Sequence, residues 1–458
     1  MQSANHPHGI VSILSLIYLA ELATGLTVVG LCKLTLPIQH IFESKWGVLA
    51  VASGGVALVV VALTIRQAIS IKRSAAIALM INIATIATTT ILAEVTLRVM
   101  ATHEAAGIRT VNALLAPSWP EIVKKNREII FRATPSGSWS EPYFVYDRDL
   151  GWSIGPNRRS KDGFYHSSLE GIRSDGPGFS YENVDGSATV ALVGDSNAFS
   201  LEVPYRESWG YHLQEALPQG TVVLNYGVDG YGIDQVFLRY DRDVRPEKPD
   251  VVVIAIIQHD FYRSFAAYTF LSFPAWELRF AKPRFVVLGD QLVLRNNPVP
   301  TPEAIMAAKS VHDLPNIELD IGYDTYRWRS RFSEWPYVIR LFTSLFPAKR
   351  DPSDGFSDEA IIELNSRILR LFHERVSAEP STPLLVLLPS GAKTNDLARA
   401  ALQHAGLPFL DLSNCLTALP EARRRVASGA HFTGAANKLF ADCAAPSIAS
   451  LLERREER

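Results

Sequence analysis

The sequence is poor in cysteine, with only Cys32, Cys415 and Cys443 in 458 residues. These cysteines form no CxxC pair and show no zinc-like spacing, and the histidines are scattered. We therefore expect no metal and no other cofactor. The sequence also lacks an excess of charge of one sign. Its formal net charge is -2, which argues against the basic balance of nucleic-acid-binding proteins, so we expect no nucleic acid partner.

Charge is nearly absent from three stretches of the first hundred residues, Gly9–Leu31, Trp46–Ile65 and Ala75–Leu97. The middle stretch carries no charge, and the other two carry one glutamate each. Each is close to the ~20 residues that a helix needs to cross a bilayer. A cleaved signal peptide is disfavoured because Met1–His8 contains no Lys or Arg. The alternative, three buried helices of a soluble protein, fits the charge-free stretch poorly. We predict about three transmembrane helices in residues 1–100.

The loop between the second and third stretches contains Arg66, Lys72 and Arg73. The positive-inside rule places this loop in the cytoplasm, so the third helix runs outward. Everything after Arg98 is then extracytoplasmic. The sequence predicts a protein of the cell (inner) membrane whose C-terminal domain is periplasmic.

After the apolar region, residues 101–187 form a linker and a small β-rich lead-in, by our interpretation. Residues 188–458 then alternate strands with helices, which is typical of an α/β domain with a parallel sheet. We expect strands at Thr189–Val193, Val222–Asn225, Val251–Ile257, Pro383–Leu388 and Pro408–Leu412, and helices at Trp209–Leu217, Asp234–Val244, Ala360–Val376, Asp396–Ala405 and Thr433–Leu452.

The alternation is interrupted at about 261–357. Within this insertion, Phe285–Leu288 and Leu292–Arg295 flank a Gly-Asp turn and predict a β-hairpin. Two interpretations of the insertion stand side by side. The insertion is either a lid or substrate platform, or a segment that only packs against the domain.

Four polar segments lie at strand ends or helix starts of the predicted domain. Gly194–Asn197 (Gly-Asp-Ser-Asn) follows the first strand, and the glycine-rich Asn225–Gly232 follows the second. Gln258–Asp260 follows the third strand, and Ser428–Phe432 precedes the last helix. One parallel sheet would bring all four together at its carboxyl edge, where such sheets bind ligands.

In this order, the segments resemble the four blocks of the SGNH (GDSL-type) hydrolase family, which carry a Ser, a Gly, an Asn and a His. The resemblance covers roughly Ala188 to Leu452, and the layout resembles membrane-anchored members that act outside the cytoplasm, often near envelope glycans. It implies a three-layer domain with a parallel sheet. It also implies that Ser196 attacks an acyl carbonyl with His431 as general base. The backbone N–H groups of Ser196 and Gly230 would contribute to an oxyanion hole.

Two departures from the family pattern bear on activity. His259 stands where the family has its Asn oxyanion donor, and a ring nitrogen can still donate there. Ser428 and Gly429 stand where the family usually places the Asp that orients its His. Candidates for that role are the carbonyl or side chain of Ser428 and, at longer range, Asp411. Asp195 either stabilises the turn or supports the site.

Three hypotheses follow for the function. The leading one is a membrane-anchored, extracytoplasmic esterase that acts on acyl esters, including O-acyl groups of envelope or exported glycans. The second is an O-acyltransferase that uses the same Ser and His. The third, which the missing acid keeps open, is a catalytically inactive module that binds glycans or assists their assembly. Cys415 and Cys443 flank His431 and either form a disulfide or remain two buried thiols.

Overall fold

A computed structural model describes the chain at residues 74–104, 107–133, 143–160, 162–184, 186–272, 281–323, 334–345, 356–390 and 395–456. The first two predicted spans, Gly9–Leu31 and Trp46–Ile65, and Cys32 lie outside these residues. The third apolar stretch is helical, in α3 (Ser74–Val99). Within the described ranges, α3 is the one helix long and apolar enough to cross a bilayer, at Met80–Val99.

The chain divides into two compact units. The described part of the first comes from within Met1–Glu121 and Thr325–Lys349. It holds α3, an antiparallel sheet of three short strands and one helix of the insertion. These elements are β1 (Thr102–Glu104), β2 (Gly107–Thr110), β3 (Ala113–Leu114) and α11 (Tyr337–Leu345).

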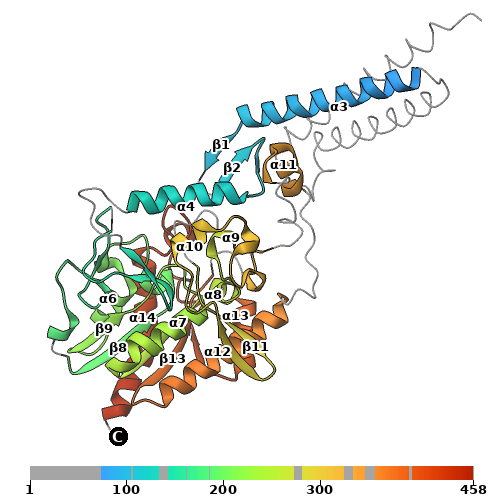
Figure 1. Cartoon of the computed structure of the whole chain (residues 1–458). Helices are drawn as coiled ribbons and strands as arrows, with labels where there is room; N and C mark the ends of the chain where they lie inside the picture. Colours follow the sequence, from blue (N-terminus) through green and yellow to red (C-terminus); the bar gives the residue numbers. More distant parts are fainter. Residues whose placement is uncertain are drawn as a thin grey trace, which may run out of the picture. The chain divides into compact units, whose positions relative to one another are not determined.

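The second unit, Ile122–Asp324 with Arg350–Arg458, is built on a five-stranded sheet (Figure 1). All neighbouring strands run parallel, in the order β14-β13-β10-β8-β9. The strands are β8 (Ala188–Val193), β9 (Thr221–Asn225), β10 (Val251–Ile256), β13 (Thr382–Leu387) and β14 (Phe409–Asp411). The chain starts at β8, steps to β9 at one edge, and then crosses back to build the other side. This arrangement is the α/β domain with a parallel sheet that the sequence predicts.

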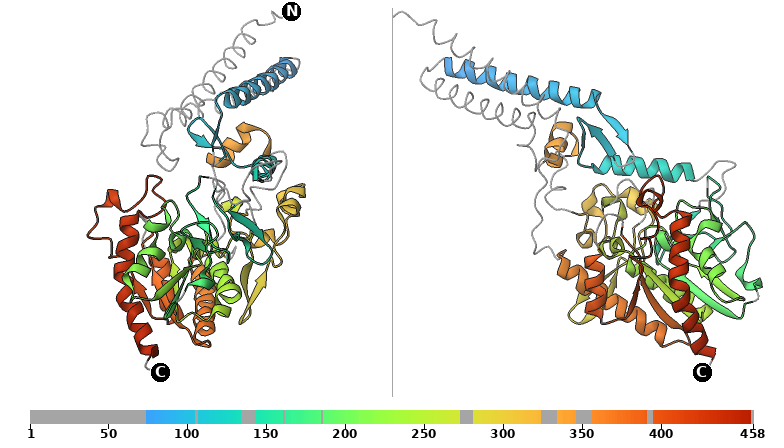
Figure 2. Two further views of the ribbon diagram at one scale, coloured as in Figure 1. Left: turned by 90° about the vertical axis from the view of Figure 1, so that its left-hand side faces the viewer. Right: turned by 180° about the vertical axis from the view of Figure 1, so that it is seen from behind.

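Helices cover both faces of this sheet, as the two views in Figure 2 show. Alternate residues of each strand point to opposite faces. In β8, Ala191 and Val193 pack into the core beneath α7, α12 and α13, whereas Val190 and Leu192 pack beneath α6 and α14. The strands are apolar on both sides because both faces are covered. The helices are α6 (Trp209–Ala216), α7 (Ile233–Arg239), α12 (Asp358–Ser377), α13 (Asp396–Ala405) and α14 (Gly434–Glu456).

Most of the predicted elements of this unit are confirmed to within a few residues. One helix differs: the segment predicted as Asp234–Val244 is α-helical only to Arg239 and continues as a π-helical turn, Tyr240–Val244. The last helix continues through Pro446 to Glu456. The predicted hairpin is present as β11 (Arg284–Leu288) paired with β12 (Gln291–Arg295).

Shorter elements precede and connect the sheet strands. Residues 143–184 form two small antiparallel ladders, preceded by a helix that the sequence did not predict. The elements are α4 (Trp119–Ala133), β4 (Phe144–Asp147), β5 (Gly151–Ile154), β6 (His166–Ser167), β7 (Arg173–Ser174), α5 (Ser196–Phe199), α8 (Gln258–Arg263), α9 (Thr269–Ser272) and α10 (Pro302–Ala307).

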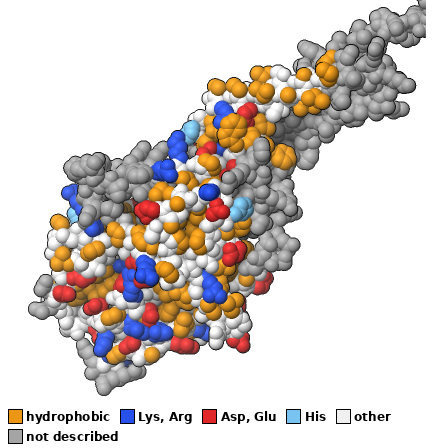
Figure 3. Space-filling model, in the orientation of Figure 1, with side chains coloured by type: hydrophobic (Ala, Val, Ile, Leu, Met, Phe, Trp, Pro, Cys, Tyr) orange, Lys and Arg blue, Asp and Glu red, His pale blue; other side chains and the backbone are white. Residues whose placement is uncertain are grey.

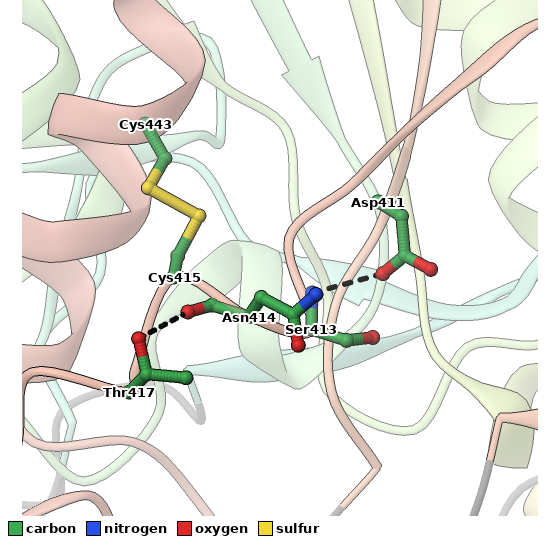
Figure 4. Close-up of a disulfide and its surroundings, with 6 residues drawn as sticks. All are labelled: Asp411, Ser413, Asn414, Cys415, Thr417 and Cys443. Carbon is green, nitrogen blue, oxygen red and sulfur yellow. Dashed lines mark hydrogen bonds between the residues drawn. A yellow bond between two sulfur atoms is a disulfide. The ribbon is translucent and has the colours of Figure 1, made fainter.

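A disulfide joins Cys415, which follows β14, to Cys443 in α14, with 6.4 Å between the Cα atoms (Figure 4). Of the two states that the sequence left open, the structure has the bridge. The bridge closes a loop with a sequence separation of 28, and His431 lies inside this loop. It therefore restricts the segment that carries this histidine.

We predict that the Cys443→Ser variant loses about 3–4 kcal/mol of the free energy of unfolding of this unit, because an open loop of this length gains entropy in the unfolded chain. Thermal or urea unfolding of the full chain in detergent, with and without reductant, measures this change. Cys32→Ser is the control and should behave as wild type. A wild-type chain whose stability does not respond to reductant would contradict the prediction.

Candidate active site

The site residues lie at the carboxyl edge of the sheet, after three neighbouring strands. Ser196 follows β8, Gly230 follows β9, and His259 follows β10. The strand order changes direction between β8 and β10, because β9 lies on one side of β8 and the later strands lie on the other. Open parallel sheets bind ligands at such a switch point, outside the carboxyl ends of the strands.

Ser196 is the first residue of the short helix α5, and Asp195 caps this helix. The Asp195 Oδ1 atom accepts a hydrogen bond from the backbone N of Asn197 at 2.8 Å. Gly194 permits the tight turn from β8 into α5, since a Cβ there would lie 2.6 Å from the carbonyl oxygen of Ala255 in β10. The amide of a first helical residue has no acceptor within its helix. The Ser196 N–H is thus available to a ligand.

His431 lies within hydrogen-bond distance of the serine. Its Nε2 is 3.0 Å from Ser196 Oγ. The histidine sits on a loop whose base is closed by a hydrogen bond from Val426 N to the His431 carbonyl at 3.0 Å. The Arg425 guanidinium stacks on the Phe432 ring, 3.9 Å from its centroid, at the same base. The structure therefore brings together the two residues that the sequence singled out, from segments 235 positions apart.

The other nitrogen of the imidazole faces a carboxylate that the sequence analysis missed. His431 Nδ1 is 2.5 Å from Glu202 Oε2. A carboxylate accepts hydrogen bonds, so Nδ1 carries the proton and Nε2 is left to accept the proton of Ser196. Ser196, His431 and Glu202 thus form a continuous hydrogen-bonded chain in the order of a nucleophile–base–acid triad.

The acid is not one of the residues expected to orient the histidine. Ser428 does not hold Nδ1: its Oγ donates to the same Glu202 Oε2 at 2.8 Å and accepts from Ala430 N at 3.1 Å. Asp411 binds elsewhere, accepting from Arg399 Nε and from Ser413 N, both at 2.9 Å. The expectation that Ser428 or, at longer range, Asp411 orients the imidazole is corrected: the contact to Nδ1 comes from Glu202, on the segment that follows Ser196.

The loop that carries Glu202 is held by residues of the lead-in. The buried Arg173 donates to the carbonyls of Ser200 and Val203 at 2.6 and 2.5 Å, and also to that of Phe199. The Tyr165 hydroxyl accepts from the backbone N of Glu202 at 2.7 Å. Glu202 has φ 67° and Ser200 has φ 61°, a left-handed conformation that residues other than Gly seldom adopt. These contacts fix a strained turn, as is common at functional sites.

A buried ionic cluster lies behind the serine. Arg263 Nη1 contacts Asp195 Oδ2 at 2.9 Å and Asp260 Oδ1 at 2.7 Å, and all three side chains are buried. Burial and the nearby Asp195 carboxylate raise the pKa of Asp260 well above its ordinary value, and Arg263 opposes this shift.

One carboxylate of this cluster also lies close to the Ser196 hydroxyl. Ser196 Oγ lies 3.3 Å from Asp195 Oδ2, a second acceptor beside His431 Nε2. This carboxylate oxygen already accepts from the Arg263 guanidinium, which weakens it as an acceptor. The shorter contact to His431 is therefore the favoured one.

The remaining oxyanion candidates are placed by the loops beside β8. Gly230 has φ 81°, so its backbone takes a left-handed turn that a side chain would disfavour. The preceding carbonyl, of Asp229, is held by Trp152 Nε1 at 2.8 Å. His259 is in the first turn of α8, at the carboxyl end of β10. Burial raises the pKa of the Asp229 carboxyl, and the nearby His431 and Arg263 oppose this shift.

Across the described ranges, no group of three or more His, Cys, Asp or Glu side chains could hold a metal ion.

No protein-family model matches the sequence, and the curated proteins that were compared give no match. Solved structures do give matches, over somewhat more than half of the chain. A lipase/acylhydrolase from Enterococcus faecalis matches at 12% identity and a TM-score of 0.31, covering 57% of this chain and 96% of its own. TesA matches at 14% identity and a TM-score of 0.32, covering 57% and 99%. Axe2, an acetylxylan esterase from Geobacillus stearothermophilus, matches at 12% and 0.29, covering 59% and 95%.

These proteins are what the chain is similar to, and the chemistry of this chain has to be argued from its own contacts. Three of those contacts escaped the sequence analysis, those of Glu202, Arg173 and Arg263. Glu202 carried one available signal, because it is an acidic residue just beyond the nucleophile's helix. It lies far from His431 in the sequence, whereas the family pattern places the acid just before the histidine.

We predict that Arg263→Met destabilises the unit by about 3–5 kcal/mol, because it leaves two buried carboxylates without their cation. Urea unfolding followed by tryptophan fluorescence measures the loss. Arg206→Met is the matched control, since Arg206 pairs with Asp175 on the surface and its loss should change stability little. Equal effects of the two substitutions would show that the buried cluster does not stabilise the fold.

Proposed function

We propose that this chain is an ester hydrolase that uses Ser196 as nucleophile, His431 as general base and Glu202 as the acid that orients the base. The observation that carries the proposal is the pair of contacts on one imidazole, at 3.0 Å to Ser196 Oγ and 2.5 Å to Glu202 Oε2. A histidine at an arbitrary surface position would not be expected to contact both a buried serine and a carboxylate at the switch point of the sheet.

In the proposed reaction, Ser196 Oγ attacks the acyl carbonyl carbon while His431 Nε2 takes its proton. The imidazolium that forms is stabilised by Glu202 across the Nδ1–H bond. His431 then gives the proton to the leaving alcohol, and the acyl group remains on Ser196. Water, activated by the same histidine, attacks this acyl-enzyme and releases the acid and the free serine.

Charge that develops on the carbonyl oxygen requires hydrogen-bond donors. The amides of Ser196 and Gly230, with the His259 ring, are the proposed donors, and one such donor is worth ~3–4 kcal/mol in a measured protease case. Asp195 is proposed to act as a positioning residue, because it caps α5 and so holds Ser196 in place. His259 brings a larger ring than an asparagine would, so we expect a pocket of different shape on that side.

The substrate class is part of the proposal. The resemblance to membrane-anchored SGNH hydrolases favours O-acyl groups of cell-envelope or exported glycans, and the similarity to an acetylxylan esterase fits the same class. We also propose that α3 spans the cell membrane with its C-terminal end outward, so that the hydrolase unit lies outside the cytoplasm. The Cys415–Cys443 disulfide supports this location, because structural disulfides persist in oxidising compartments.

The hydrogen-bonded triad favours hydrolysis over an inactive binding module, since binding alone has no use for an aligned base and acid. Acyl transfer uses the same acyl-enzyme and differs only in the acceptor. A glycan acceptor added to the assay distinguishes the two: transfer faster than hydrolysis would assign the chain as an O-acyltransferase.

We predict that Ser196→Ala abolishes hydrolysis of acetylated oligosaccharides and of an activated acetyl ester by the purified chain. Glu202→Gln should lower kcat by up to ~10⁴-fold, because an amide no longer imposes the productive tautomer on His431.

Asp411→Asn is the matched control for Glu202→Gln, since it removes the charge of the other carboxylate considered for this role. It should keep nearly full activity. Hydrolysis that is equal in wild type and Ser196→Ala would refute the enzymatic proposal. Loss in Asp411→Asn with none in Glu202→Gln would refute the assignment of the acid.

We predict that a reporter active only outside the cytoplasm is active when fused after Ala101. A cytoplasmic reporter at the same point should be inactive, and activity of that reporter would reverse the proposed orientation.

A further inference from the structure

Glu94, near the end of the apolar helix α3, supplies the cap for the start of α11. Its carboxylate accepts from the backbone N of Tyr337 and of Val338, each at 3.0 Å. Amides of a first helical turn have no acceptor within the helix, and negative charge is favoured beside them. The insertion thus returns to α3, 243 positions away in the sequence, and begins a helix there.

Arg98, one turn further along α3, contacts Trp335, two residues before this helix. Its guanidinium pairs with Glu94 at 2.7 Å and donates to the Trp335 carbonyl at 3.0 Å. The same group lies over two aromatic rings, 4.3 Å from the centroid of Tyr337 and 5.1 Å from that of Trp335. The end of α3 and the start of α11 therefore form one structure of a carboxylate, a guanidinium and two aromatic rings.

One face of α11 is buried within the first unit. Tyr337 packs with Leu97, Ile108 and Leu115 in a small apolar core. Arg340 donates to the Ala116 carbonyl at 2.6 Å and forms a bidentate pair with Glu121. These contacts set the rotation of the helix about its axis.

The opposite side of α11 is apolar and exposed. Ile339 and Phe342 lie three residues apart in α11 and so share one side of the helix, and Trp335 lies two residues before its start; their exposed fractions are 41%, 63% and 75%. This stripe begins beside the end of α3, where Val99 and Met100 are also exposed. Hydrophobic side chains continue along α3 itself (Figure 3), among them Ile91, Leu92 and Val95.

We propose that α11 is an interfacial helix that lies on the bilayer at the point where α3 leaves it, with Trp335, Ile339 and Phe342 facing the lipid. Three observations indicate that lipid covers this surface. It continues the exposed apolar side of a helix of spanning length. Trp and Tyr beside an Arg at the end of that helix are typical of the membrane–water interface. An amphipathic helix with such a stripe buries it at the boundary of headgroups and acyl chains.

This placement gives the insertion a role other than a lid. The segment 334–345 attaches the hydrolase chain to the membrane at a second point, far from α3 in the sequence. The inference rests on the proposed membrane span of α3 and is independent of ester hydrolysis.

The test uses the full chain with Cys32→Ser, reconstituted into phosphatidylcholine vesicles and labelled with a fluorophore at one introduced cysteine. Ile339→Cys reports α11, Val95→Cys reports α3, and Leu288→Cys, at an exposed apolar position of the β11–β12 hairpin in the second unit, is the reference. Each label is exposed to acyl chains carrying bromine, which quench from within the bilayer, and to iodide in the aqueous phase.

We expect the labels at 339 and 95 to be quenched by brominated lipid at least severalfold more than the label at 288, and iodide to show the reverse order. Quenching at 95 without quenching at 339 overturns the proposal and leaves the span of α3 intact. Protection of 339 from both quenchers means that protein covers the stripe, which also overturns it. Absence of lipid quenching at both 95 and 339 would refute the proposed membrane span of α3 and, with it, the interfacial placement of α11.

Discussion

The site depends on one carboxylate being held in one place. Glu202 accepts from His431 Nδ1 and from Ser428, and so joins the nucleophile's segment to the loop before α14. Its turn has a backbone conformation that the sequence alone does not favour, and Arg173 and Tyr165 hold that turn. Residues 143–184 are therefore part of the apparatus that aligns the imidazole, in addition to packing against the domain.

The parts of the fold that rest on local pattern could be predicted. Apolar runs such as those of β8 and β10 are buried on both faces, and their length and spacing mark them as parallel strands. Ser196 and His431 each occupy a strand end or a helix start, and parallel sheets gather these at one edge. The alternating pattern of strands and helices predicts the topology of the sheet. That topology places the two residues close together.

The parts that rest on tertiary contacts could not be predicted in this way. Glu202 becomes the partner of His431 because two left-handed positions, Ser200 and Glu202, turn the chain back, and the residues that hold this turn lie in other segments. Glu94 would be read as a charge near a membrane boundary, yet it caps a helix that begins 243 residues later. The π-helical turn after α7 likewise replaces a regular helix that propensity favours.

The division of the triad along the chain sets the order in which the site can become competent during synthesis. The nucleophile and the acid leave the ribosome together, on one short segment, whereas the base follows more than two hundred residues later, with a sequence separation of 235 from the serine. Under the proposed function, a nascent chain that contains Ser196 and Glu202 but not yet His431 lacks its proposed general base. We therefore expect no ester cleavage by this chain before the domain is complete.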